Sequence, residues 1–504
     1  MAAEPEPHLD PEDWQEFRRA SHRALDAMID HVRTIRDGPV WQAAPADVRA
    51  RFRTALPRAP RGLDEVLGDF DALIKPYATG NVHPLFMGWV HGAGTPVGML
   101  AEMLAAGLNA NCGGRNHIGL VVERQVVDWA AELFGFPPAS SGVFVTGTSA
   151  ANLLALLVAR NAALGDEVRA DGLRAGPQLA CYASAQAHGC VVQASEIAGV
   201  GSRHLRLVPV DADGAMRVDL LAEAIVRDRQ AGLRPFMVTA TAGTVNTGAF
   251  DDLAAVAAVC RTERLWFHVD GAFGALCALA PGLRHRVAGI AAADSIAFDF
   301  HKWAHVPYDA GFLLVRDGEA HRRTFANQAA YLSRLPGGLA AGETWPCDLG
   351  PDLSRSFRAL KTWFTFQVLG ADRIGACIEH TCRVAKHLEA LLRGSDLFEL
   401  RAPVALNVVC FGLKAPGDGG LERDIVVDLH ESGAAAPSIT VLDGKPAIRA
   451  AIVNHRTTAA DMDAFHDALS ASLRRVLLRR MKNAAPGETP APAGEKPRRD
   501  AARR

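Results

Sequence analysis

The chain has 504 residues, of which 49% are hydrophobic and 22% charged, the balance of an ordinary globular protein. Its 54 basic and 56 acidic residues give a formal net charge of −2, so no excess of positive charge indicates a nucleic-acid or membrane-surface partner. Nine scattered cysteines without a CxxC pair exclude a dense disulfide framework and a zinc-ribbon spacing, and we expect no metal site.

The first 110 residues are predicted to be largely helical. Residues 11–36 place apolar side chains at helical spacing; these are Trp14, Phe17, Leu25, Met28, Ile29 and Val32. A proline-broken connector follows to about residue 62, and 96–110 reads as another helix. The acidic, proline-bearing start is unlike a signal peptide, and the apolar runs are too short to span a bilayer. We therefore expect a soluble, cytoplasmic protein.

From about residue 140, short apolar runs alternate with helical stretches. The predicted strands are 142–146, 179–184, 204–210, 235–243, 266–272 and 294–302. This alternation predicts an α/β fold with a mostly parallel central sheet and helices on both faces. Ligands of such sheets bind in the loops beyond the carboxyl ends of the strands, so we expect the functional residues there.

The C-terminal quarter reads as a smaller α+β unit. A helix at 373–394 is followed by four strand-like runs and a final helix from about 459 to 482. Residues 484–504 are rich in Pro, Ala and Gly, and this composition predicts disorder. The expected organisation is an N-terminal helical segment at 1–95, a large domain at 96–372, a small domain at 373–483 and a tail at 484–504.

Two strand ends carry the residues of greatest chemical interest. Lys302 follows the apolar run SIAF in DFHKW, and Asp270 ends the apolar run in WFHVDGA. Each has an ordinary interpretation: a lysine that reaches solvent, and an acid that caps a turn. The functional interpretation is that the desolvated Lys302 amine forms a Schiff base, and that the Asp270 carboxylate lies on the same rim of the sheet.

Three further loops follow predicted strands. In TGTSAAN, Thr148, Ser149 and the first helical N–H groups form an anion site at the positive end of a helix, although a plain helix cap has the same pattern. His188 in SAQAHG and Thr244 in TAGTVNTGAFDD lie at the same edge. Each of these motifs is weak evidence alone. Because all of them follow predicted strands, together they place polar groups at the same edge of the sheet as Asp270 and Lys302.

With these motifs, the sequence resembles the group II pyridoxal-phosphate (PLP)-dependent amino acid decarboxylases, of the aromatic-L-amino-acid decarboxylase type. The resemblance runs from about Trp14 to Leu478. It is carried by HPLFMGWV (83–90), VERQVVDW (122–129), TGTSAAN, SAQAHG, ATAGTVNTGAFDD, WFHVDGAFG, DSIAFDFHKW and SRSFRALKTWF (354–364). It implies PLP fold type I, an aspartate aminotransferase-like architecture, in a homodimer whose N-terminal segments pack on the partner and whose active sites are shared.

The resemblance also implies roles for the residues quoted above. Lys302 would hold the cofactor, and Asp270 would pair with its ring nitrogen, which must stay protonated if the ring is to accept electrons. His188 would stack on the ring, and Thr148 and Ser149 would hold the phosphate. The remaining predicted cofactor contacts are Thr244, Ala272 and His301.

For the substrate, the resemblance implies contacts with His83, Phe86 and Trp89, and with Asn111 in the partner-subunit stretch NANCGGRNH. Tyr331, in NQAAYLSRLPGG, matches the family's mobile-loop tyrosine, which protonates the substrate carbon after carbon dioxide leaves. The expected reaction is decarboxylation of an L-amino acid to its amine. An aromatic substrate is favoured, although Arg115 and His117 depart from the aromatic pattern toward a more polar pocket.

Two alternatives remain open from the sequence. One is another PLP fold type I activity: a non-aromatic amino acid decarboxylase, an aldehyde synthase, or an aminotransferase, in which an arginine such as Arg449 would hold the carboxylate. The other is a non-catalytic scaffold of the same fold, which the presence of Lys302, Asp270, His188 and Tyr331 disfavours.

Overall fold

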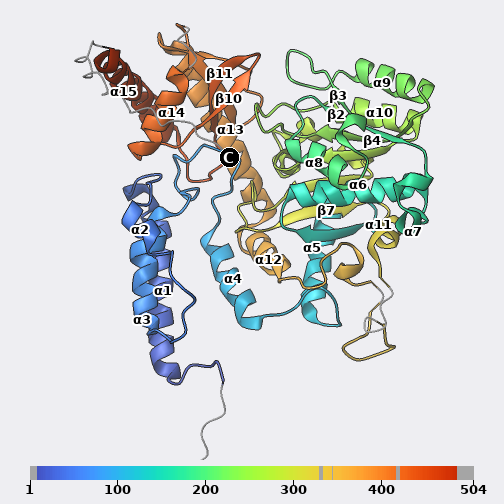
Figure 1. The fold of residues 1–504 in the computed structure, drawn as a ribbon, viewed down its shortest axis with the longest axis horizontal. Coiled ribbons are helices and arrows are strands. Elements are labelled where there is room, and N and C mark those ends of the chain that lie inside the picture. Colours follow the sequence, from blue (N-terminus) through green and yellow to red (C-terminus); the bar gives the residue numbers. More distant parts are fainter. Residues whose placement is uncertain (1–7, 328–332, 343, 416–419, 485–504) are drawn as a thin grey trace, which may run out of the picture.

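A seven-stranded sheet forms the centre of the protein in a computed structural model that describes residues 8–327, 333–342, 344–415 and 420–484. The strand order is β1-β7-β6-β5-β4-β2-β3 (Figure 1). The strands are β1 (Ser141–Val145), β2 (Leu179–Ser184), β3 (Leu205–Val208), β4 (Arg234–Thr241), β5 (Trp266–Asp270), β6 (Ser295–Asp299) and β7 (Gly311–Val315). β7 pairs antiparallel with β1 and β6, whereas β3, β2, β4, β5 and β6 pair parallel. The predicted mostly parallel sheet is confirmed.

Helices cover both faces of this sheet, as its apolar strands require. The helices of this part are α4 (Pro96–Leu108), α5 (Ile118–Phe134), α6 (Thr148–Leu164), α7 (Val168–Asp171), α8 (Gly189–Ile197), α9 (Val218–Gln230), α10 (Leu253–Glu263), α11 (Gly318–Phe325) and α12 (Arg358–Leu369). Helix α6 is apolar around most of its circumference and packs on β6 and β7 with α8 beside it. Helices α5, α9 and α10 supply the core of the opposite face.

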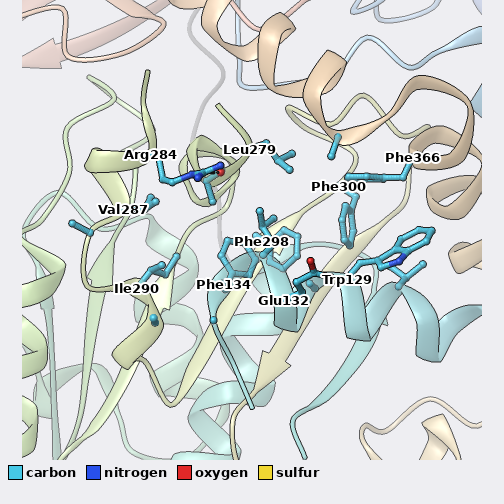
Figure 2. A pocket seen from close by; sticks show the side chains of 18 of the residues that line it. Trp129, Glu132, Phe134, Leu279, Arg284, Val287, Ile290, Phe298, Phe300 and Phe366 are labelled. Carbon is cyan, nitrogen blue, oxygen red and sulfur yellow. Dashed lines mark hydrogen bonds between the residues drawn. The ribbon is translucent and has the colours of Figure 1, made fainter. Parts of the chain in front are cut away.

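The packing of the large domain leaves an apolar cavity of about 720 Å³ next to α5. Aromatic side chains from three elements line it; those labelled in Figure 2 include Trp129, Phe134, Phe298, Phe300 and Phe366. The charged side chains on its wall are those of Glu132 and Arg284. This lining is suited to packing rather than to acid–base chemistry, although the cavity is larger than the one that contains Lys302.

The small domain has a four-stranded antiparallel sheet of order β10-β11-β9-β8. Its elements are β8 (Phe398–Leu400), β9 (Val408–Leu413), β10 (Ser438–Leu442), β11 (Lys445–Ala451), α13 (Ala371–Gly394), α14 (Leu421–Glu431) and α15 (Ala459–Ala484). Leu388, Phe411, Ile425 and Phe465 are among the buried residues of its own core. The helix and strands predicted for this region are therefore present. The predicted tail begins at residue 484, which is the last residue of α15, and its remaining residues, 485–504, lie outside the described residues.

The N-terminal segment forms an arm of three helices, α1 (Trp14–Arg33), α2 (Ala46–Ala50) and α3 (Leu63–Asp69). Figure 1 shows these helices standing apart from the large sheet. Trp14, Phe17, Ile29 and Val66 are exposed on the arm, so a single chain leaves this apolar surface uncovered. Among the helices of the described segments, none combines the length and apolar composition that crossing a bilayer requires.

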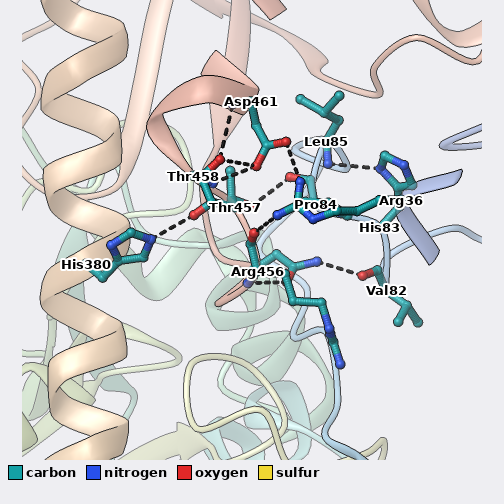
Figure 3. Close-up of polar contacts among 11 residues, drawn as sticks. Arg36, Val82, His83, Pro84, Leu85, His380, Arg456, Thr457, Thr458 and Asp461 are labelled. Atoms are coloured by element: carbon teal, nitrogen blue, oxygen red, sulfur yellow. Dashed lines mark hydrogen bonds and ion pairs between the residues drawn. The ribbon is translucent and has the colours of Figure 1, made fainter. Parts of the chain in front are cut away.

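A cluster of hydrogen bonds and an ion pair joins Arg36 and residues 82–84 to the small domain (Figure 3). Arg36 pairs with Asp461 across 2.6 Å, and the Thr457 hydroxyl donates to the Pro84 carbonyl across 2.7 Å. The Asn454 side chain donates to the Val82 carbonyl at 2.9 Å. These bonds fix residues 82–84, from which the chain continues along the edge of the site that contains Lys302.

Candidate active site

A cavity of about 320 Å³ lies at the carboxyl ends of β1, β2, β4, β5 and β6, where the sequence predicted a ligand site. Its wall combines residues from five strand ends and from the segment after residue 89. They are Val90, His91, Thr146, Gly147, Thr148, Ser149, His188, Cys190, Thr241, Gly243, Val245, Asp270, Ala272, Phe273, Asp299, His301, Lys302 and Tyr308. The predicted residues Thr148, Ser149, His188, Asp270, Ala272, His301 and Lys302 thus surround one space.

Asp270 ends β5 at the buried side of this cavity and is 2% exposed. Its Oδ2 accepts a hydrogen bond from Asn152 Nδ2 at 2.9 Å, and its Oδ1 accepts from the Ala272 N–H at 3.2 Å. Burial raises the pKa of the Asp270 carboxyl, while the Asn152 amide and the Lys302 charge act in the opposite direction. The carboxylate is therefore held by donors that favour its charged form.

A buried chain of hydrogen bonds continues behind Asp270. Asn152 Oδ1 lies 2.8 Å from His268 Nε2, and His268 Nδ1 lies 2.8 Å from Ser295 Oγ, which accepts from Trp266 Nε1–H at 2.8 Å. Burial lowers the pKa of His268 to about 3, so its imidazole is neutral.

The hydrogen bonds that Asp270 accepts set the direction of this chain. Both of its oxygens act as acceptors, so Asn152 presents its NH₂ group to Asp270 and its carbonyl to His268. His268 must then donate from Nε2 and accept at Nδ1 from the Ser295 hydroxyl. Every member is satisfied in this arrangement, which holds the Asn152 amide in the orientation that supports the carboxylate.

The opposite end of the cavity is the N-terminus of α6. Gly147 precedes the helix and packs against Gly311, where a Cβ would overlap the Gly147 backbone. The Thr148 N–H donates to Asp299 Oδ1 at 2.7 Å. The Thr148 hydroxyl is buried without a hydrogen-bond partner among the described residues. An unsatisfied buried hydroxyl at the positive end of a 17-residue helix is suited to binding an anionic group.

Lys302 lies between these two ends, after the last residue of β6. Its Nζ is 2.9 Å from Asp299 Oδ2, and its side chain is 22% exposed. The neighbouring His301 accepts the Ala310 N–H at Nδ1 (3.0 Å), so Nε2 carries the proton and lies 3.7 Å from Asp299 Oδ2. Burial lowers the pKa of His301 to about 4. Lys302 is therefore the cation of this cluster, and His301 is neutral.

His188 borders the cavity from the turn between β2 and α8. Its Nδ1 accepts the Cys190 N–H at 3.2 Å and so caps α8, and the residue itself is exposed. The Cys190 thiol faces the same space and accepts from Asn152 Nδ2 at 3.3 Å. Burial raises the pKa of this thiol to about 11, so Cys190 is a protonated wall residue and not a nucleophile.

His91 and Tyr308 form a wall that the sequence reasoning missed. The segment with His91 reaches the cavity because the next residue, Gly92, packs directly against the backbone of His301 and Lys302. A Cβ added at Gly92 would overlap the carbonyl oxygens of these two residues. The Tyr308 ring centroid lies 4.3 Å from that of His301 and 6.0 Å from that of His91. Burial raises the pKa of the Tyr308 hydroxyl to about 12 and lowers that of His91. Both groups are uncharged at neutral pH.

Other predicted residues are placed away from the cavity wall. The Thr244 hydroxyl is turned into its own loop, where it accepts from the Ala249 N–H at 3.1 Å; Thr241, Gly243 and Val245 line the cavity instead. Thr244 is fully buried, and its contact with the cofactor ring stays a prediction.

The four predicted substrate residues are also outside this lining. His83 is buried beside Arg36, where its Nδ1 accepts the Leu85 N–H at 3.0 Å. Phe86 and Trp89 stack around His91 with ring centroids 5.8 Å from it. Asn111 accepts the Gly113 and Arg355 N–H groups at 3.0 Å. In a single chain, none of these four contacts the cavity directly, and Tyr331 lies outside the described residues.

Arg115 and His117, which suggested a more polar pocket, have local partners. Arg115 lies over the Trp345 ring at 4.8 Å, and His117 caps α5 by accepting the Gly119 N–H at 3.2 Å. Across the described ranges, no group of three or more His, Cys, Asp or Glu side chains is arranged to hold a metal ion.

Known proteins resemble this chain over most of its length. A family model described as the pyridoxal-dependent decarboxylase conserved domain matches residues 45–414. An aromatic-L-amino-acid decarboxylase of Bacillus atrophaeus is 31% identical over 469 residues, 89% of this chain and 93% of that protein. A phenylacetaldehyde synthase of Arabidopsis thaliana is 30% identical over 463 residues, 88% and 93% of the two chains. The crystal structure of Oryza sativa TDC with PLP and tryptamine has a TM-score of 0.85 at 25% identity, covering 93% of this chain and 100% of that one.

Proposed function

Because the chain belongs to the pyridoxal-dependent decarboxylase family, we propose that the cavity around Lys302 and Asp270 is the active site in which it decarboxylates an L-amino acid. The family's cofactor is PLP, and the enzyme class is that of the amino acid carboxy-lyases. The observation that carries the assignment of the site is that one cavity contains a lysine, a buried carboxylate and a helix N-terminus.

The residues present fit this cofactor. The unpartnered Thr148 hydroxyl and the N-terminus of α6, with Ser149 beside them, offer donors to a phosphate. Asp270 offers an oriented carboxylate at the buried side for a ring nitrogen. Lys302 lies between them with an amine that can join the cofactor's aldehyde. Ala272 and His301 border the same space, and His188 is positioned to cover it from the exposed side.

When bound, the cofactor accepts the electron pair that the departing carboxyl group leaves on the substrate's α-carbon. The protein's part in this step is electrostatic and positional. Asp270 keeps a proton on the ring nitrogen, because its charge stabilises the cationic ring. The neutral side chains of His301 and Tyr308 offer little solvation to a carboxylate, and poor solvation favours its loss as neutral carbon dioxide.

A proton must then reach the α-carbon. We propose Tyr331 as its donor on the strength of the motif NQAAYLSRLPGG, which matches the family's loop tyrosine. Tyr308 is the alternative donor among the described residues, because it lines the cavity and burial raises the pKa of its hydroxyl to about 12. Without efficient protonation, oxygen can divert the reaction to an aldehyde, and one relative is a phenylacetaldehyde synthase.

The substrate we propose is an aromatic L-amino acid. Relatives named for aromatic, tryptophan and tyrosine substrates support this choice, as does the cluster of rings that Phe86, Trp89, His91 and Tyr308 form beside the cavity. We further propose a homodimer in the cytoplasm, in which a partner covers the exposed apolar face of the N-terminal arm and brings the stretch around Asn111 to the site. No nucleic-acid or membrane partner is part of this proposal.

The test is a panel of L-amino acids incubated with the holoenzyme, with carbon dioxide, amine, aldehyde and peroxide measured together. We expect one mole of amine per mole of carbon dioxide from tyrosine, tryptophan, phenylalanine or DOPA, and no turnover by Lys302→Ala. Turnover confined to acidic or aliphatic substrates would refute the aromatic choice. A wild-type protein that stays colourless with the cofactor would refute the enzymatic assignment and favour a scaffold.

A further inference from the structure

A carboxylate already occupies part of the anion site at the start of α6. Asp299 is 1% exposed at the end of β6. Its Oδ1 accepts the Thr148 N–H at 2.7 Å, and its Oδ2 lies 2.9 Å from Lys302 Nζ. Thus one residue binds both the first amide of the helix and the reactive lysine.

The charges around Asp299 leave little to balance a second anion. Lys302 is its ion-pair partner, and His301, at 3.7 Å, is neutral because burial lowers its pKa to about 4. Lys361, which lies farther out, pairs with Glu102 at 3.0 Å. Asp309, on the loop packed over His301, pairs with Arg358 at 2.7 Å. A phosphate carries about −1.5 to −2 charges near pH 7. Beside Asp299 it would be attracted mainly by the N-terminus of α6 and by Lys302, and it would be repelled by the Asp299 carboxylate.

We propose that Asp299 is a resident anion of the phosphate site, which weakens the phosphate's contribution to cofactor binding and so keeps the cofactor exchangeable. The inference rests on the proposed function, because it takes the cofactor's phosphate to bind at α6. The buried, unpartnered Thr148 hydroxyl marks the position next to Asp299 that a phosphate oxygen would use. Close like charges oppose binding.

Asp299→Asn separates this role from simple helix capping. The amide has nearly the same shape, and its oxygen can still accept the Thr148 N–H, so the cap is kept while the charge is removed. A second role of Asp299, holding the Lys302 ammonium, would affect every aldehyde that joins the lysine. A charge in the phosphate site would affect the affinity for an aldehyde that carries a phosphate. A partner of the Lys302 ammonium would affect the affinity for aldehydes with and without a phosphate alike.

The experiment compares dissociation constants of PLP and of pyridoxal, which lacks the phosphate, by titrating the apoenzyme and following visible absorbance. The ratio of the pyridoxal constant to the PLP constant isolates the phosphate's contribution. We expect Asp299→Asn to raise this ratio at least about tenfold over wild type. Inorganic phosphate, added as a competitor, should inhibit PLP binding by Asp299→Asn at a lower concentration than by wild type, which distinguishes a general phosphate site from one specific to the cofactor.

The control is Asp228→Asn, in which a buried carboxylate also has one cation partner, Arg206 at 2.7 Å, and one neutral donor, Tyr182 at 2.8 Å. Its ratio should match wild type. An unchanged or lowered ratio in Asp299→Asn, or an equal change for both aldehydes, would overturn the proposal in favour of a cap or a lysine partner.

Asp299→Ser, which also removes the charge, must shift the ratio in the same direction; failure of both variants to fold would show that Asp299 is structural and would likewise overturn it. If wild type itself forms no visible band, the proposed function fails, and not this inference alone.

Discussion

Asn152 donates its side-chain N–H to Asp270 across 2.9 Å, and both side chains are buried. One residue belongs to α6 and the other ends β5, so the helix that begins at the anion site also orients the carboxylate on the other side of the cavity. His268 holds the other end of the Asn152 amide at 2.8 Å. The two ends of the proposed cofactor site are therefore coupled through α6.

Removing the Asn152 amide should impair catalysis more than folding. Asn152→Leu keeps the volume but deletes the donor to Asp270, and a hydrogen bond to a charged group contributes about 1.5–3 kcal/mol. We expect kcat to fall roughly tenfold to a hundredfold, while the cofactor still binds. Asn161→Leu is the matched control, since Asn161 is also buried on α6 but its Nδ2 has no partner among the described residues. Equal kcat values for the two variants would show that the contact is only structural.

His268 should make the folded protein sensitive to acid. Its pKa is about 3 in the folded state against an ordinary value of 6.5, so between these pH values the unfolded chain binds a proton that the folded chain does not. Stability is therefore lost as the pH falls from 6.5 toward 3. His268→Gln, which can still donate to Asn152, should reduce the loss of unfolding free energy between pH 7 and pH 5 by about 2 kcal/mol. Urea titrations at both pH values measure this.

Thr381→Ser, a change at a buried position that removes no titratable group, is the control for that comparison. It should lose as much stability between pH 7 and pH 5 as wild type does. Other buried histidines, including His301 and His321 with pKa values of about 4, leave some acid sensitivity in every variant. An unchanged loss in His268→Gln would mean that its imidazole is protonated in the folded protein.

Two tyrosine variants distinguish the candidate proton donors. If Tyr331 protonates the α-carbon, Tyr331→Phe should release less amine and more aldehyde and peroxide per carbon dioxide, because the phenol is removed while carboxylate loss continues. Tyr308→Phe should then keep a one-to-one ratio of amine to carbon dioxide. The reverse pattern would assign the proton to Tyr308, and unchanged ratios in both would require another donor. Product analysis under air gives all four quantities.

His91 is predicted to contribute to substrate binding rather than to the chemical step. Its imidazole borders the cavity and lies beside the Tyr308 ring. His91→Ala should raise KM roughly tenfold, the loss of about one hydrogen bond and some ring contact, with kcat changed less than threefold. A fall in kcat at unchanged KM would instead make His91 part of the chemical machinery.

The parts of the site that the sequence predicted are those that end strands. Asp270 and Lys302 each follow an apolar run, and consecutive parallel strands bring such ends to one edge. His91 and Asn152 could not be assigned in this way. The position of His91 depends on the contact of Gly92 with residues 301 and 302, which are distant in sequence. Asn152 was visible only as a polar residue within an apolar helix, and its partner on β5 depends on the helix's rotation.

Turn geometry decides the orientation of the Thr244 side chain. The motif fixed the loop but not which of its side chains faces the cavity, because the bond between Thr244 and Ala249 turns that hydroxyl inward. His83 illustrates the same limit: its motif was recognised, but its position follows from the attachment of this segment to the small domain. In both cases the deciding contacts are tertiary or depend on turn geometry that composition does not specify.

The most direct measurement is to identify the lysine that carries the cofactor. The holoenzyme is reduced with borohydride, digested, and mapped by mass spectrometry, with Lys302→Ala treated in parallel. We expect one modified residue, Lys302, and no modification above background in the variant. Stoichiometric modification of another lysine in the wild type, or of the variant to the same extent, would contradict the assignment of this cavity as the active site.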